Sequence, residues 1–180
     1  MNIKTLIGLG VVALLVIFGI SKYNTLVEEQ QQVNQSWAQV ENQYQRRADL
    51  IPNLVNTVKG AADFEQQTLT DVIEARSKAS SIQVSADDLN NPQKVQQFQQ
   101  AQQQLSGALS RLLVTVEKYP ELKANQNFRD LQVQLEGTEI AYQPNRQRFN
   151  EAVQSYNTTV QRFPSNVFAG TIWFREEGLL

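Results

Sequence analysis

The sequence contains no cysteine and no histidine. The commonest catalytic base, the thiol nucleophile and most transition-metal ligands are therefore missing, and a di-iron bundle site built on Glu-x-x-His pairs is excluded. There is also no glycine-rich phosphate loop and no Gly-x-Ser-x-Gly elbow. The neighbours Asp87 and Asp88 are more typical of helix capping in a polar loop than of a Mg²⁺ site. We therefore expect no enzymatic activity, no cofactor and no metal.

Glycine, proline and net charge are also low, with 8 glycines, 5 prolines and a formal charge of −2 in 180 residues. A nucleic-acid-binding protein normally shows a clustered basic face, so we expect no nucleic-acid partner. Glutamine and asparagine are abundant, apolar residues interrupt them at helical intervals, and no stretch alternates with period two. This composition predicts an all-α protein.

One long hydrophobic run, Leu6 to Ile20, lies near the N-terminus and carries no charge. Residues 5–21 would span roughly 25 Å as a helix, enough for a thin bilayer. The alternative is a cleaved signal peptide, since small residues occur at 19–21. We favour a retained single-pass anchor because the helical pattern continues through Lys22. Lys4 and Lys22 balance each other, so the positive-charge rule predicts neither orientation.

After the anchor, apolar residues recur every three or four positions in long stretches, which predicts helices with one buried stripe. The first helix should continue to Lys59, with a kink at Pro52 and Gly60 as a left-handed cap. The second should cover about residues 61–81, followed by a connection with one turn begun by Ser85.

Asn91 and Pro92 predict the start of a third helix that ends at Pro120. The fourth helix should begin at Asn125 or Asn127, bend at Pro144 and end before Pro164.

Four helices with short connections predict an antiparallel up-down four-helix bundle with coiled-coil-like packing, continuous with the N-terminal transmembrane helix. The expected organisation is an N-terminal tail at 1–4, the anchor at 5–21, the helical bundle at 22–163 and an apolar C-terminal tail at 164–180.

Two polar residues within the first helix, Arg46 and Arg47, form the most conspicuous charged pair. Arg47 falls on the buried stripe, and Asp130 and Glu139 lie on the fourth helix. The two readings are an ion pair across the bundle and an anion or lipid-phosphate site. We favour the ion pair because Arg46 lies some 35 Å along the helix from the membrane.

The C-terminal tail is rich in apolar and aromatic residues. Since the fourth helix returns toward the membrane, the tail should lie near the bilayer surface, where tryptophan and basic residues are favoured. The alternatives are a fold back onto the base of the bundle and a contact with a neighbouring protomer. The residues concerned are Val167, Phe168, Ile172, Trp173, Phe174 and Arg175.

Several short stretches carry a family resemblance. They are Tyr23-Asn24-x-Leu26-Val27, Trp37-Ala38-x-Val40, Gln43-Tyr44-x-Arg46-Arg47, Leu50-Ile51-Pro52-Asn53-Leu54-Val55, Tyr119-Pro120-x-Leu122-Lys123-Ala124-Asn125, Phe149-Asn150-x-x-Val153, Tyr156-Asn157 and Phe163-Pro164. On these residues the chain resembles the LemA family of bacterial membrane proteins. One departure is Pro144, where family members run through as uninterrupted helix.

The resemblance implies an N-terminal anchor, a helical bundle and no established catalytic activity. It suggests a scaffold or assembly factor at the bacterial cytoplasmic (inner) membrane, with the lipid bilayer, further copies of the chain and partner membrane proteins as its contacts. A second reading is an extracytoplasmic ligand-binding or sensory bundle that acts through a partner membrane protein. The resemblance implies a short N-terminus outside and a bundle in the cytosol, whereas the balance of Lys4 and Lys22 predicts neither side, so both orientations are kept as expectations.

Overall fold

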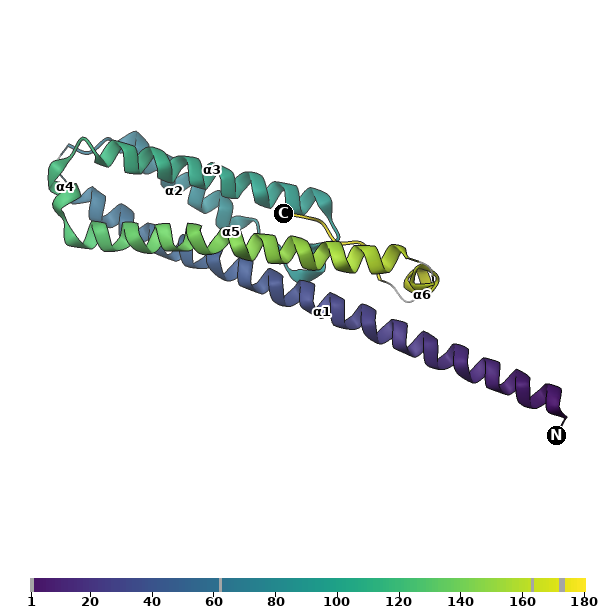
Figure 1. Cartoon of the computed structure of the whole chain (residues 1–180). Coiled ribbons are helices and arrows are strands. Elements are labelled where there is room, and N and C mark those ends of the chain that lie inside the picture. Colours follow the sequence, from purple (N-terminus) through teal and green to yellow (C-terminus); the bar gives the residue numbers. More distant parts are fainter. Residues whose placement is uncertain (1, 62, 163, 172–173) are drawn as a thin grey trace.

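The computed structural model describes residues 2–61, 63–162, 164–171 and 174–180. Within these residues the chain forms helices and no strand, which confirms the all-α prediction (Figure 1). In chain order the elements are α1 (Ile3–Lys59), α2 (Gln66–Ser81), the short 3-10 helix η1 (Ala86–Asp88), α3 (Pro92–Val116), α4 (Pro120–Ala124), α5 (Gln126–Gln161) and α6 (Ser165–Thr171).

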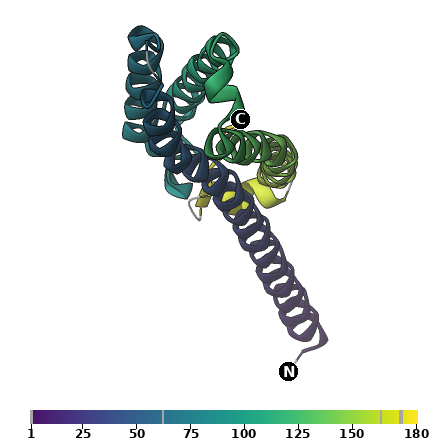
Figure 2. The same cartoon turned by 90° about the vertical axis from the view of Figure 1, so that its left-hand side faces the viewer.

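Helix α1 runs unbroken for 57 residues, with Pro52 inside it. Its first third projects away from the bundle, as Figures 1 and 2 both show, and the apolar side chains there are exposed. Within the described residues it is the one helix long and apolar enough to cross a membrane. The remainder buries a stripe spaced by three and four residues, which is the periodicity seen in the sequence. The buried positions are Leu26, Val33, Trp37, Val40, Tyr44, Arg47, Ile51, Leu54, Val55 and Val58.

The four long helices alternate in direction, so α5 returns beside α1 and ends near the point where α1 leaves the bundle (Figure 1). The closest pairs are α1 with α5 and α2 with α3. The end of the chain lies between α3 and α5, as both views show (Figures 1 and 2). Pro144 lies inside α5, and the helix continues through it without a break.

Two hydrophobic clusters fill the bundle, one near α4 and one at the base near the anchor. Trp37 centres the basal cluster and is only 2% exposed. Its ring lies 5.6 Å from that of Phe98 on α3 and 5.4 Å from that of Phe149 on α5. Its indole Nε1 donates to the Val84 carbonyl at 3.0 Å. Trp37 therefore joins three helices and the α2–α3 connection.

The predicted N-terminal caps are present. The Asn91 side chain accepts hydrogen bonds from the amides of Gln93 and Lys94 at 3.2 and 3.3 Å. Asn125, not Asn127, begins α5, because its side chain accepts from the Phe128 amide at 3.1 Å. Ser85 begins η1 through a capping box with Asp88.

Some helix ends differ from the sequence-based expectation. Gly60 keeps a right-handed conformation with φ of −71°, and the left-handed residue is Asp63, at φ 60°. Asp tolerates this region because its short side chain bonds locally. The turn pushes the start of α2 from the predicted residue 61 to Gln66.

Pro120 does not end the third helix, which stops at Val116, but begins α4. A proline at the first helical position loses no hydrogen bond, because that amide has no partner in a helix. Beyond Pro164 the expected tail contains α6 and, in its described residues 174–180, a segment that is neither helix nor strand.

We expect Trp37→Ala to lower the free energy of unfolding by about 3–5 kcal/mol, because it removes the buried ring that joins three helices and leaves a cavity. Urea unfolding of the detergent-solubilised full chain, followed by circular dichroism, measures this. The control is Gln45→Ala on the exposed face of the same helix, with a change within about 0.5 kcal/mol. A loss below about 1 kcal/mol for Trp37→Ala would contradict the packing described here.

Candidate functional site

The C-terminal residues 174–180, here called the strap, form neither helix nor strand and run along the basal half of the bundle (Figure 1). They are tied to α5 by two asparagine side chains. Asn157 Nδ2 donates to the Glu177 carbonyl at 2.9 Å, and its Oδ1 accepts from the Glu177 amide at 2.8 Å. Asn150 makes the same pair of bonds with Leu180, both at 2.9 Å. Each asparagine thus saturates the main chain of one strap residue.

Helix α3 and the connection before it hold the other side of the strap. The Gly178 amide donates to the Leu89 carbonyl at 2.7 Å, and the Gln99 side chain donates to the Leu179 carbonyl at 3.3 Å. A Cβ on residue 178 would lie 3.1 Å from the Leu89 carbonyl oxygen, so glycine permits this close approach. Arg146 Nε donates a further bond to the main-chain oxygen of Leu180 at 3.0 Å. The strap is therefore recognised mainly through its backbone.

Two strap side chains add apolar contacts. Leu180 is 6% exposed and joins the basal cluster. Phe174 is half-buried, with its ring 5.8 Å from Tyr23 on α1 and 6.5 Å from Tyr156 on α5. Tyr23 directly follows Lys22 at the predicted end of the anchor, so Phe174 lies close to the expected membrane boundary.

The tail residues proposed for the membrane interface lie in different places. Val167 on α6 is 57% exposed, and Arg175 is exposed on the strap. Phe174 packs against the basal cluster. Ile172 and Trp173, and the side chain of Phe168, lie outside the described part of the chain.

Glu177 carries a carboxylate that the strap holds at the base of the bundle. One of its oxygens, Oε2, is buried without a hydrogen-bond partner among the described residues. Burial, and then the nearby Asp87 carboxylate of η1, raise the pKa of Glu177 to about 7. The neighbouring phenol is affected in turn: burial and then the Glu177 charge raise the pKa of Tyr156 to about 12. Ionised Glu177 is thus destabilising in the docked strap.

A second polar cluster surrounds Arg47, which is 6% exposed. Its Nη1 donates to Ser106 Oγ at 2.8 Å and lies 3.4 Å from Glu139 Oε2, and its Nη2 donates to Gln102 Oε1. Its guanidinium also lies 5.4 Å from the ring centre of Tyr44. Burial lowers the pKa of Arg47, while the Glu139 charge opposes that change. Arg47 is therefore a polar link among α1, α3 and α5.

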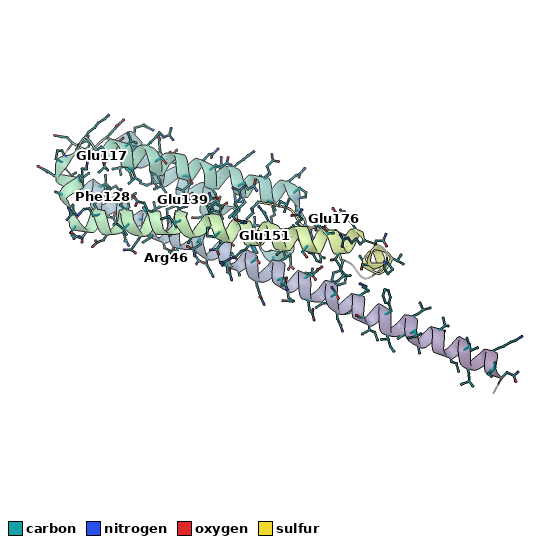
Figure 3. The ribbon with its side chains drawn as sticks, viewed as in Figure 1. Arg46, Glu117, Phe128, Glu139, Glu151 and Glu176 are labelled. Atoms are coloured by element: carbon teal, nitrogen blue, oxygen red, sulfur yellow. The ribbon has the colours of Figure 1, made fainter. Side chains whose placement is uncertain are left out.

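Arg46, the other arginine of the predicted pair, is exposed on α1, and Figure 3 shows it away from the side where Glu139 lies between α5 and α3. The Glu139 side chain is itself 54% exposed, so its ion pair with Arg47 is half open to water. Such a pair is screened and contributes little. The hydrogen bonds that Arg47 donates to Ser106 and Gln102 of α3 therefore stabilise this cluster more than the ion pair does.

The Arg47 cluster opens into a groove between α3 and α5. A hollow of about 270 Å³ lies there, directly beyond the end of the strap. Its walls carry mostly amide, hydroxyl and guanidinium groups: Tyr44, Arg47, Gln99, Gln102, Gln103, Ser106, Glu139, Tyr142, Gln143 and Arg146. Within the described residues, no group of three metal-ligating side chains occurs. Chemically, this groove offers hydrogen bonds and positive charge.

The sequence-based reasoning did not predict the strap contacts. Asn150, Asn157 and Gly178 were not predicted as site residues, nor were Gln102 and Ser106 as partners of Arg47. One signal was present: an aromatic residue followed by asparagine occurs at 149–150 and again seven residues later at 156–157. Asparagine is unfavourable inside a helix, so its repetition on one face indicates that these side chains form hydrogen bonds with another segment.

We expect Gln102→Leu to cost about 1–3 kcal/mol of stability, because it keeps the volume but leaves the buried Arg47 charge without its nearest acceptor. In contrast, Glu139→Gln should cost less than about 1 kcal/mol, since that carboxylate is half exposed. Urea midpoints of the two variants provide the comparison. A reversed order would show that the ion pair, not the α3 hydrogen bonds, stabilises Arg47.

The raised pKa of Glu177 predicts a pH dependence of stability. The unfolded chain releases this proton near 4.5, whereas the folded chain keeps it until about 7. The folded state therefore binds more protons in this interval, so stability should be highest below it and fall as the pH rises to about 7. Glu177→Gln should flatten the urea midpoint over this range.

The matched control is Glu176→Gln, which changes the exposed neighbouring carboxylate and should keep the wild-type slope. If Glu177→Gln also kept that slope, another group would be responsible.

A sequence model of the LemA family matches residues 36–180, a range that includes Arg47, both clamping asparagines and the strap. A protein of Metamycoplasma hominis named Protein LemA is 22% identical over 150 residues, which make up 83% of this chain and 64% of that protein. The match thus spans less than two thirds of that relative. It confirms the resemblance drawn from the short motifs. The chain belongs to the LemA family.

Proposed function

We propose that this protein is a non-catalytic, membrane-anchored scaffold or assembly factor that self-associates at the bacterial cytoplasmic membrane. The observation that carries the proposal is the form of α1. Its apolar residues from 3 to 20 are exposed on all sides, and the same helix continues without interruption into the bundle. Lipid is the environment that would cover such a surface, and a helix is the form that lipid permits.

A scaffold needs surfaces for other proteins, and the bundle offers exposed apolar side chains outside the anchor. Val133 and Ile140 are 66% and 75% exposed and lie seven residues apart on one face of α5. Val167 on α6 is exposed near the base. Apolar positions that share one face of a helix suit contact with another copy or a partner membrane protein.

The alternative is a ligand-binding or sensory bundle that acts through a partner membrane protein. A second hollow, of about 330 Å³, favours it. This hollow lies beside Trp37 and Tyr44 and also touches Arg76, whose Nε donates to the Ala48 carbonyl at 2.8 Å. A volume of this size is at the lower end for small-molecule sites.

Light scattering after size-exclusion chromatography of the detergent-solubilised full chain distinguishes the two functions. The scaffold proposal expects a particle larger than one protomer, after correction for detergent, that dissociates on dilution. A strictly monomeric particle whose melting temperature rises with a small molecule would favour the sensory reading.

A further inference from the structure

The two clamping asparagines match the geometry of an extended peptide. Asn150 and Asn157 are seven residues apart on α5, which corresponds to about 10.5 Å along a helix. The strap residues that they hold, Glu177 and Leu180, are three residues apart, which corresponds to about 10 Å in extended chain. Seven residues of helix therefore match three residues of extended chain in length. Asn157 binds the main chain of Glu177, and Asn150 binds that of Leu180, three residues further on.

The same face of α5 continues past the strap. Seven residues before Asn150 lies Gln143, an exposed side-chain amide that lines the 270 Å³ hollow beyond Leu180. Gln99 of α3, which already bonds the strap, lines the same hollow. The amide-bearing groove is therefore longer than the segment that occupies it.

We propose that the α3–α5 groove is a peptide-binding site that reads an extended main chain, and that residues 174–180 of a second copy occupy it when protomers associate. In the single chain, the strap is bound to its own groove. This inference rests on the proposed self-association and names its contact.

A second copy is the partner that the contacts favour. The main-chain bonds would accept any extended segment, but the side-chain contacts would not. Gly178 is needed where the backbone approaches Leu89 to within hydrogen-bond distance, and Leu180 is buried in the basal cluster. Phe174 packs between Tyr23 and Tyr156. Another copy of the chain supplies this combination unchanged, and exchange of an identical element creates no new interface chemistry.

Two features of the strap favour its release from the groove. The hydrogen bonds that hold its backbone to α5 are only part-buried, and Leu179 is 56% exposed. Its residue Glu177 has a buried carboxylate oxygen, Oε2, with no hydrogen-bond partner among the described residues. Anchoring in a bilayer concentrates neighbouring copies, so a segment that leaves one groove meets another at high effective concentration.

Because the chain has no cysteine, thiol cross-linking can report the exchange without background. Full-length Gln99→Cys and full-length Leu179→Cys are mixed in detergent and treated with a short thiol-specific cross-linker. Trans docking should give a covalent dimer in several-fold excess over a mixture of Leu179→Cys with Glu74→Cys, an exposed position on α2. The double variant carrying Gln99→Cys and Leu179→Cys reports the strap in its own groove.

Asn150→Ala with Asn157→Ala should abolish the excess of dimer, whereas Gln143→Ala, on the same face but beyond the strap, should retain it. Cross-linking the double variant within one chain at high dilution, before assembly, should convert the light-scattering oligomer to a monomer. An oligomer that persists with no excess of dimer would overturn strap exchange, leave self-association standing and redirect attention to Val133 and Ile140. A monomer at every concentration would overturn both. Failure of the double variant to cross-link at all would overturn the groove itself.

Discussion

The structure depends on one helix, α1, whose two parts present different surfaces. Over residues 3–20 its apolar side chains face outward on every side, while over residues 26–58 a single stripe is buried against the other helices. A helix satisfies its own backbone hydrogen bonds whether water, protein or lipid surrounds it. Because α1 is unbroken, the direction of residues 3–20 is coupled to that of the bundle, and the other helices pack on the side that the stripe defines.

At the base of the bundle, packing and polar recognition are combined. Trp37 packs against Phe98 of α3 and Phe149 of α5, and the strap residue Leu180 joins the same basal cluster. Asn150 and Asn157 then satisfy the strap backbone, which has no neighbouring strand to supply its hydrogen bonds. Buried backbone groups without partners are costly, so an extended segment needs such side chains to lie on a helical surface.

The Arg47 cluster shows how the bundle handles a charge in its interior. The guanidinium is desolvated on the α1 stripe, and α3 supplies the acceptors that compensate through Gln102 and Ser106. Glu139 balances the charge from the edge of the groove. This arrangement links α1 to α3 and α5 through hydrogen bonds and one ion pair.

Much of this protein followed from the sequence, because helix periodicity and capping are local properties. The exposed apolar start of α1, the stripe through Trp37 and Arg47, the Asn91 cap and the all-α class are each encoded within a few turns of chain. The position of residues 174–180 could not follow from such rules, since an extended segment has no periodicity of its own. Its place was decided by the distance between α3 and α5 and by the match between seven helical residues and three extended ones. Only the packed helices bring Asn150, Asn157 and Leu89 to one groove, and that tertiary arrangement gives the strap its binding site.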